Sequence, residues 1–457
     1  MTDGYTRFVS GLLFPLHERL KRHVTVPVMR SLEESQWWSA DRIEHARVAR
    51  LRRFLADIGA HVPYYRALFR ATGFDPGSVR ETSDLGLLPL LGKAEIRANL
   101  DAMKADDARR LSRFNTGGSS GEPLVFYIGD ERVSHDVAAK WRATRWWGVD
   151  IGDPEIVVWG SPIELGAQDR LRSMRDRLLR TELLPAFEMS EAKLDDFLDR
   201  IRKRRPRMLF GYPSALSHIG LYAEKQRVRM DELGIRVAFC TSERLYEHQR
   251  QAIERVFGCP VANGYGSRDA GFIAHQCPEG SLHLTAEDII VEIIAGDGTL
   301  LPPGEAGEIV VTHLATRDFP FVRYRTGDIG VLATEPCACG RGLPVLHDVQ
   351  GRATDFVVAR DGTVMHGLAL IYVLRDMGDV AGFKIVQEDL DLTRVLVVPG
   401  EGFDVATEQA IRDGLGARLG AGVEVRVERV AEIPADKSGK FRYVVSRAAA
   451  ADGGVAA

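Results

Sequence analysis

The chain reads Phe114-Asn115-Thr116-Gly117-Gly118-Ser119-Ser120-Gly121-Glu122-Pro123, directly before a run, Leu124–Ile128, that predicts a β-strand. Glycine places no Cβ between backbone and ligand, so this loop allows the main chain to approach a guest closely. Successive backbone N–H groups in such a loop form an anion-binding concavity. We predict a polyphosphate-binding loop at a strand edge, distinct from the common nucleoside-triphosphate loop because no lysine follows the last glycine. A solvent-exposed Gly/Ser turn is the alternative interpretation.

The composition is that of a globular protein. The 457 residues are enough for two or three domains, with 45% hydrophobic and 27% charged residues. A net charge of −4 gives no electrostatic argument for nucleic acid. We expect no transmembrane helix and no secretion signal, because neither apolar pattern is present. Five cysteines, two of them separated by one residue, favour a reducing compartment, so we expect a cytoplasmic location.

The first hundred residues predict helices. An apolar stripe runs along the first of them and consists of Phe8, Leu12, Leu13 and Leu16. We expect this stripe to pack on the protein's own core. A membrane surface is the alternative, because basic residues follow at positions 19–23. Further helices are predicted over Glu44–Ile58 and Lys93–Met103.

Strands and helices then alternate. The predicted strands are Glu155–Gly160, Met208–Tyr212 and Val237–Ser242, and the predicted helices are Ser134–Trp147, Leu194–Arg204, Pro213–Glu224 and Tyr246–Phe257. Such alternation predicts βαβ units and a largely parallel sheet. Ligands of these sheets bind beyond the carboxyl ends of the strands.

Two strand ends carry notable residues. One is Thr241–Arg244, and the other is Asn263–Asp269 after a short strand, Pro260–Ala262. A carboxylate beside a glycine turn is suited to Mg²⁺, and Tyr265 could stack on a base. A solvated turn with a capping aspartate is the alternative.

The pattern changes from about residue 282. Short strands separated by Gly/Pro turns predict an antiparallel β subdomain, which Tyr324–Asp328 closes with another turn carboxylate. We place a boundary at Gly351-Arg352, which gives a large domain over 1–350 and a small α+β domain over 351–457.

Five stretches occur in order: Thr116–Gly121, Tyr265–Asp269, Tyr324–Asp328, Gly351-Arg352 and Ser438–Lys440. Together they resemble the adenylate-forming superfamily of acyl-CoA synthetases, adenylation domains and luciferases. Val62–Tyr65 and the Cys-x-Cys-Gly-Arg stretch resemble its phenylacetate–CoA ligase branch, which includes capsule-biosynthesis-type relatives. The resemblance implies an α/β fold. A large domain would have mostly parallel sheets flanked by helices plus a β subdomain, followed by a small mobile α+β domain.

The resemblance also implies a role for each motif. The β- and γ-phosphates of ATP would lie on Thr116, Gly117, Gly118, Ser119, Ser120 and Gly121. Adenine would stack on Tyr265 in a pocket that also holds Glu243, Gly264, Gly266 and Ser267. Asp328 would hold the ribose with support from Arg352, and Lys440 would reach the α-phosphate. Asp269 would hold Mg²⁺ where relatives more often have glutamate, so coordination through water is an option.

The implied reaction joins two anions. A carboxylate attacks the α-phosphate of ATP and expels pyrophosphate, so the site must neutralise charge, and Mg²⁺ and Lys440 would do this. The acyl-adenylate then passes to the thiol of coenzyme A. A carrier-protein thiol or an amine is the alternative acceptor, and a non-catalytic nucleotide-binding scaffold is a second alternative. The acid is left open, with an acyl pocket expected near Trp159, Tyr212–Ser214, Phe239-Cys240 and Gly264.

The cysteines suggest a metal. Cys277, His283, Cys337 and Cys339 match a structural Zn²⁺ site in ligand number and type. His275 is the alternative fourth ligand, and unrelated reduced cysteines are the alternative to any metal. Cys240 and Cys259 are expected in the core.

Overall fold

The computed structural model describes residues 3–116, 124–160, 170–186, 188–350, 356–375, 377–433 and 443–448. Several predicted positions lie outside this part of the chain: Gly117, Gly118, Ser119, Ser120, Gly121, Gly351, Arg352 and Lys440. Their roles stay predictions. No helix in the described part is both long enough and apolar enough to cross a membrane.

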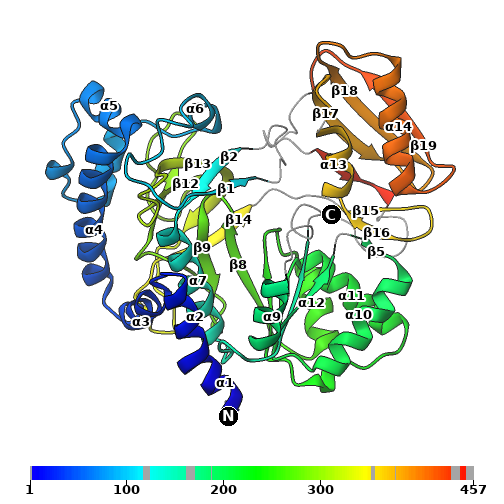
Figure 1. Cartoon of the computed structure of the whole chain (residues 1–457), viewed down its shortest axis with the longest axis horizontal. Coiled ribbons are helices and arrows are strands. Elements are labelled where there is room, and N and C mark those ends of the chain that lie inside the picture. Colours follow the sequence, from blue (N-terminus) through cyan, green and yellow to red (C-terminus); the bar gives the residue numbers. More distant parts are fainter. Residues whose placement is uncertain are drawn as a thin grey trace.

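The N-terminal region is helical, as predicted (Figure 1). Its elements are α1 (Gly4–Phe8), the π-helical turn η1 (Val9–Leu13), α2 (Phe14–Leu20), α3 (Thr25–Ser35), α4 (Ala40–His61), α5 (Pro63–Thr72), the 3₁₀ turns η2 (Pro76–Ser78) and η3 (Thr82–Leu87), and α6 (Lys93–Ala98). Ser39 caps α4 by accepting a hydrogen bond from the Arg42 amide. Helix α6 is shorter than predicted because the Asn99 side chain donates to the Glu95 carbonyl and ends it there.

The expectation that the first apolar stripe packs on the protein's own core is wrong for three of its four residues, since only Leu13 packs against a core cluster. Phe8, Leu12 and Leu16 are exposed and Leu13 is half-buried. The neighbouring face of the same helical segment is the buried one, because Val9 and Phe14 pack there against α3 and α7 (Asp130–Arg145).

The described strands of the large unit form an 11-stranded sheet in the order β11-β12-β13-β14-β10-β9-β8-β7-β6-β3-β4. Its parallel part consists of β3 (Glu155–Trp159), β4 (Thr181–Pro185), β6 (Met208–Gly211), β7 (Val237–Thr241) and β8 (Val261–Ser267). These strands alternate with α9 (Arg170–Leu178), α10 (Glu191–Arg204), α11 (Pro213–Lys225), the 3₁₀ turn η4 (Asp231–Leu233) and α12 (Glu247–Phe257). Leu209 and Ala238 pack in the cluster that α10–α12 form, and Phe210 and Phe239 pack toward Ala143 of α7. Apolar side chains therefore cover both faces, as a parallel sheet requires.

The antiparallel part consists of β9 (Gly271–Gln276), β10 (Leu282–Leu284), β11 (Ile289–Ile294), β12 (Ala306–His313), β13 (Phe321–Leu332) and β14 (Val345–Gln350). The predicted β subdomain is confirmed, but it continues the parallel strands through the β8–β9 pair instead of forming a sheet of its own. Two predicted turns are strand instead. Residues 263–267 belong to β8, and 324–328 lie within β13.

The C-terminal unit has its own apolar core. It contains β15 (Phe356–Val358), β16 (Val364–His366), α13 (Leu368–Arg375), β17 (Val380–Gln387), β18 (Leu392–Pro399), α14 (Val405–Leu419), β19 (Glu424–Arg429) and β20 (Val444–Ser446). Strands β15 and β16 form a three-stranded sheet with β5 (Glu188–Met189) of the large unit (Figure 1). The α/β fold class with a separate small C-terminal unit is confirmed, while the boundary at 350/351 stays a prediction because 351–355 are outside the described residues.

Candidate functional site

Two paired strands flank the predicted phosphate loop. Strands β1 (Ser112–Asn115) and β2 (Val125–Ile128) pair antiparallel. Beyond them, the Thr116 amide donates to the Leu124 carbonyl at 3.0 Å, and the Leu124 amide donates to Thr116 Oγ1 at 2.9 Å. The Thr116 hydroxyl accepts this bond, so its own proton remains available to donate to an anion.

Two tyrosine–aspartate hydrogen bonds connect the β8 region to β13. Tyr265 of β8 donates to Asp328 Oδ2 of β13 at 3.0 Å. In the opposite direction, Tyr324 of β13 donates to Asp269 Oδ2, just beyond β8, at 2.5 Å. Strands β14, β10 and β9 separate β13 from β8 in the sheet, so these bonds require the sheet to curl back on itself. The curl brings together the residues predicted to stack on adenine, hold ribose and hold Mg²⁺.

The surroundings of Tyr265 keep its hydroxyl protonated. Burial, followed by the Asp328 and Asp269 carboxylates, raises the pKa of Tyr265 well above its ordinary value. Tyr265 therefore stays protonated and donates to Asp328.

Asp269 keeps capacity for a cation. Its Oδ1 accepts from Ser267 Oγ at 2.5 Å, and its Oδ2 accepts from Tyr324. A carboxylate oxygen has two lone pairs, so each oxygen of Asp269 retains one for a metal ion or a metal-bound water. The donor set fits Mg²⁺, and Asp269 would be its protein ligand.

A buried guanidinium supports the turn that carries Asp269. Arg132 of α7 donates from Nη1 to the Asp269 carbonyl at 3.1 Å and from Nη2 to the Arg268 carbonyl at 3.2 Å. Its Nε donates to Asp136 at 2.8 Å. Although burial raises the pKa of Asp136, the Arg132 charge and His313 lower it below its ordinary value. The ion pair therefore stays charged and fixes the turn from behind.

The remaining predicted residues lie at the carboxyl ends of the parallel strands. Glu243 accepts a hydrogen bond from Ser214 Oγ, and it follows Ser242, whose φ of +72° is unusual for a residue with a side chain. Trp159 stacks on Tyr212 with ring centroids 4.5 Å apart. A Cβ at Gly264 would lie 2.8 Å from the Phe239 ring, so glycine is needed for this close approach. The residues predicted for the acyl pocket thus form an aromatic group beside Glu243.

Sequence reasoning missed two contributors to this site. Tyr324 belongs to a predicted motif but has no predicted role of its own, because that motif is interpreted as a turn, whereas Tyr324 and Asp328 lie on one strand. Arg132 gave no signal, because a charged residue in a charged helix predicts a solvated face, whereas here it is buried.

The predicted metal ligands lie together. One ligand atom from each of Cys277, His283, Cys337 and Cys339 falls within 4.8 Å of all the others. The sulfurs of Cys277 and Cys337 are 3.7 Å apart, and Cys339 Sγ lies 3.2 Å from His283 Nε2. Zn–S bonds of about 2.3 Å at tetrahedral angles place two sulfurs about 3.8 Å apart, so the spacing fits zinc. It is too long for a disulfide.

The neighbours of the cluster select His283 over His275. His283 Nδ1 faces the Leu343 carbonyl at 3.3 Å, and because a carbonyl only accepts, Nδ1 carries the proton and Nε2 is left for a metal. His275 pairs with His283 across β9 and β10 but lies outside the cluster, with its ring against Phe239 and Phe272. The expected core positions of Cys240 and Cys259 are confirmed.

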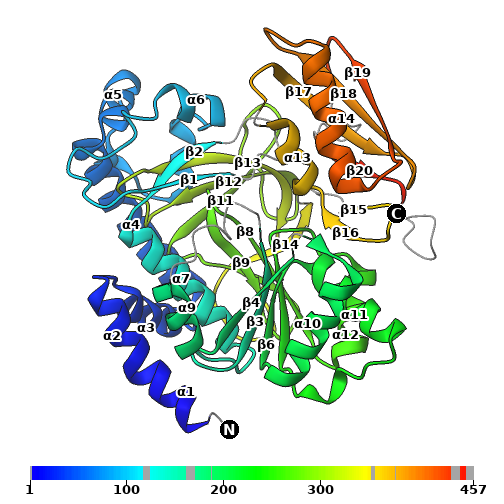
Figure 2. The same ribbon diagram turned by 45° about the vertical axis from the view of Figure 1, so that its right-hand side comes forward.

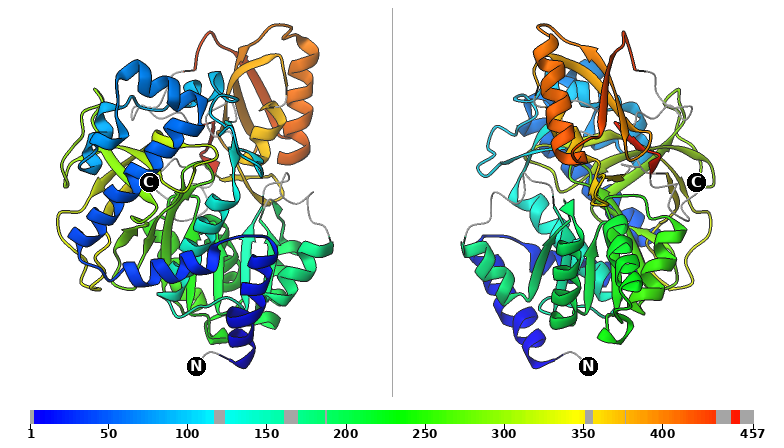
Figure 3. Two further views of the ribbon diagram at one scale, coloured as in Figure 1. Left: turned by 60° about the vertical axis from the view of Figure 1, so that its left-hand side comes forward. Right: turned by 90° about the vertical axis from the view of Figure 1, so that its right-hand side faces the viewer.

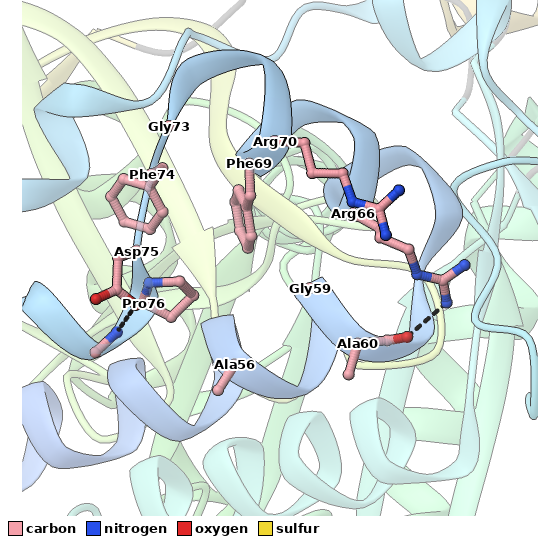
Figure 4. Close-up of a pocket in the computed structure, with 11 residues that line it drawn as sticks. Ala56, Gly59, Ala60, Arg66, Phe69, Arg70, Gly73, Phe74, Asp75 and Pro76 are labelled. Atoms are coloured by element: carbon pink, nitrogen blue, oxygen red, sulfur yellow. Dashed lines mark hydrogen bonds between the residues drawn. The ribbon is translucent and has the colours of Figure 1, made fainter.

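A separate hollow of about 680 Å³ lies between α4, α5 and η2 (Figure 4). Phe69, Phe74 and the stem of Arg70 border it, and Arg66 turns aside to donate to the Ala60 carbonyl. None of the predicted site residues lines it, so it is distinct from the candidate nucleotide site.

Two family models match the chain. One is described as AMP-binding enzyme and matches residues 184–315, and the other is described as CapK C-terminal domain and matches residues 357–447. The first spans β4 through β12, including Glu243, Tyr265 and Asp269, and the second covers most of the C-terminal unit.

Curated relatives agree with these models. The chain is 24% identical over 408 residues to protein CapK of Staphylococcus aureus, which covers 87% of this chain and 88% of that protein. It is 26% identical over 335 residues to a phenylacetate–coenzyme A ligase of Thermus thermophilus, which covers 70% and 72%. Among solved structures, a 2-hydroxyisobutyryl-CoA ligase superposes with a TM-score of 0.65 at 20% identity over 90% of this chain and 91% of that one, which supports the fold.

The cluster geometry predicts about one zinc per chain, because four soft or borderline ligands close a tetrahedral structural site. Metal analysis of protein purified without a His-tag checks this. Cys337→Ser should lose the zinc and lower the melting temperature while leaving ATP affinity nearly unchanged, since such metals supply folding energy.

Cys259→Ser is the matched control, because Cys259 is a buried cysteine outside the cluster. It should keep the metal even if it costs some stability. Intact wild-type protein without zinc or iron would contradict the assignment.

Proposed function

The chain is an AMP-forming ligase of the adenylate-forming superfamily, in its phenylacetate–CoA ligase-like branch, and on that premise we propose that it activates a carboxylic acid with ATP and transfers the acyl group to coenzyme A. The single observation that supports this best is the pair of tyrosine–aspartate hydrogen bonds that joins the β8 region to β13. It gathers an aromatic ring, a carboxylate and a second carboxylate with spare lone pairs, which are the groups that a base, a ribose and Mg²⁺ require.

In the proposed reaction, charge neutralisation is the main task of the protein. The acid attacks the α-phosphate, and the leaving pyrophosphate lies on the loop that begins at Thr116. Asp328 orients the ribose and Tyr265 the adenine, so the α-phosphate is held in line with the incoming carboxylate. Mg²⁺ held by Asp269 would supply positive charge at the phosphates, and Lys440 would stabilise the charge that develops on the α-phosphate.

The C-terminal unit is proposed to work in two positions. Lys440 belongs to it and would face the site during adenylation, after which the unit would rotate near 351–355 for thioester formation. In the structure described here, Val364 and Met365 of β16 pair with Met189 and Glu188 of β5. A rotation would have to break this pairing, and two residue pairs at a strand end are a small obstacle.

The acceptor has a specific alternative. The C-terminal unit would present the acceptor to the acyl-adenylate, and it matches the CapK C-terminal domain model. Transfer to a carrier-protein thiol or an amine is therefore our second candidate. A non-catalytic scaffold is disfavoured by Asp269, which keeps the lone pairs that a metal needs.

ATP–pyrophosphate exchange across aryl, fatty, hydroxy and amino acids tests the proposal. We expect exchange with at least one class, and the aromatic group of Trp159, Tyr212 and Phe239 favours an aryl acid. Adding coenzyme A, a carrier protein or an amine to the active pair then identifies the acceptor. Exchange with no acid in any class, from folded protein that binds ATP, would favour the scaffold.

Asp328→Ala should weaken ATP binding by about 2–3 kcal/mol, roughly 30- to 150-fold, through loss of a charged hydrogen bond to ribose. The measurement is calorimetric titration with ATP. Tyr265→Phe is the matched control, because it removes only the hydroxyl that Asp328 accepts. If both variants lose the same affinity, Asp328 acts only by positioning Tyr265 and the ribose assignment fails.

Lys440→Ala should slow acyl-adenylate formation roughly 10²- to 10³-fold, as loss of a preorganised charge-stabilising group does. Thioester formation from a supplied acyl-adenylate should remain nearly intact, because the lysine serves only the first position of the C-terminal unit. Single-turnover assays of each half-reaction measure this.

Lys437→Ala controls for general loss of basic charge in the same stretch. Equal losses in both half-reactions would falsify the two-position account.

A further inference from the structure

The exposed side of the first helical segment is apolar. Phe8, Leu12, Leu16 and Leu20, named here the N-terminal apolar stripe, are 49%, 59%, 52% and 76% exposed. Their i, i+4 spacing slightly overshoots the 3.6 residues of an α-helical turn, so an uninterrupted α-helix would let the stripe drift around its axis. The π turn η1 (Val9–Leu13) is wider and rotates the following residues back. The four side chains therefore stay on one face.

The opposite side of this segment is anchored. Val9 is fully buried, and Gly152 (φ +93°) faces it so closely that a Cβ there would lie 2.6 Å from Val9 Cβ. Thr6 Oγ1 donates to Asp153 at 2.9 Å, and Glu18 is buried against His17, His23 and Thr25. The stripe is consequently the outward side of a fixed helix, and it is not a frayed end.

Helix α9 widens the apolar surface. Tyr5 Oη donates to the Leu178 carbonyl at 2.9 Å, and Arg180 lies over the Tyr5 ring while pairing with Asp3. These contacts place the end of α9 beside α1, and Met174 and Leu178 of α9 are exposed. Six of the 14 large exposed apolar side chains in the described part of the chain thus lie in these two helical segments.

The surrounding charge is positive. Arg7, Arg19, Lys21 and Arg22 are exposed, and in the described structure none of them forms a side-chain ion pair. The only acidic residue between 4 and 32 is Glu18, which is buried. Burial, and after it the nearby Arg175, lower the pKa of Lys21, while Glu18 and Asp176 act in the opposite direction, so basic residues of the two helices lie close together.

We propose that the N-terminal apolar stripe, with Met174 and Leu178, docks the protein onto an anionic lipid bilayer. An apolar helix face flanked by exposed arginine and lysine is the pattern of a helix that lies in the membrane interface. Its apolar side chains enter the acyl boundary, and its cations meet the lipid phosphates.

The same features argue against a second copy of the chain as the occupant. Two stripes face to face would bring their basic residues together, with no exposed acidic residue in 4–32 to pair them. The segment also lies on the outer edge of the molecule, as Figures 2 and 3 show, where a flat surface can reach it. The C-terminal unit lies at the other end (Figure 1), so docking leaves it free.

Flotation of the full chain with vesicles tests the proposal. Wild-type protein should float with phosphatidylcholine vesicles that contain phosphatidylglycerol, less with phosphatidylcholine alone, and less at high salt, which screens the phosphates. Leu12→Glu with Leu16→Glu should reduce flotation about tenfold or more, because charges replace the side chains that enter the bilayer. Leu221→Glu with Leu300→Glu is the matched control at 45% and 42% exposure elsewhere, and it should float like wild type.

All four substituted leucines are exposed, so melting temperatures should stay within a few degrees of wild type, which shows that each variant folds. Wild-type protein that ignores anionic vesicles overturns the proposal. The proposal is also overturned if wild-type protein sediments as a dimer and the Leu12→Glu, Leu16→Glu variant sediments as a monomer, since a second copy would then cover the stripe. Equal affinity for polyglutamate, which offers charge without an apolar phase, would point to an acidic protein partner instead.

Discussion

Two reciprocal tyrosine–aspartate hydrogen bonds join the β8 region of the large unit to β13. Each segment supplies one hydroxyl and one carboxylate, and the two bonds connect strands that the sheet order keeps apart. A hydrogen bond to a charged group contributes about 1.5–3 kcal/mol, so the pair is strong enough to hold the curl. Everything proposed for the nucleotide depends on this curl, because without it Asp328 would lie far from Tyr265. Arg132 extends the same constraint to α7 by binding both carbonyls of the turn behind Asp269.

The alternating hydrophobic runs were sufficient to predict most of the fold. The runs Met208–Gly211 and Val237–Thr241 are fully buried and, apart from Thr241, carry no polar side chain, which is typical of the inner strands of a covered sheet. The prediction of a turn at residues 263–267 was wrong because the glycines of β8 are typical of turns. A Cβ at Gly266 would lie 2.3 Å from the Gly271 carbonyl oxygen, so this glycine allows two strands to approach and does not turn the chain.

Side-chain chemistry could be predicted more reliably than side-chain direction. The ligand types of the Cys/His cluster were sufficient to name its three cysteines and to predict a histidine as the fourth ligand, since three cysteines and one histidine match a structural zinc site. The choice between His283 and His275 needed three dimensions, because the two face each other across one strand pair. The prediction that the N-terminal stripe is buried was wrong because it, too, depended on side-chain direction. Periodicity shows that a helix has an apolar face, but the packing of Val9 and Phe14 decided which face turned inward.

The short β5–β16 ladder has a thermodynamic consequence for the whole chain. The C-terminal unit encloses its own core, and in the described residues its strand pairing with the large unit amounts to two residue pairs. So few contacts provide little coupling free energy between the unfolding of the two units, so each unit unfolds as a separate cooperative block. Heating would melt them in separate transitions, and a single unfolding temperature would not describe this protein. Substitutions that loosen one block would leave the calorimetric signature of the other in place.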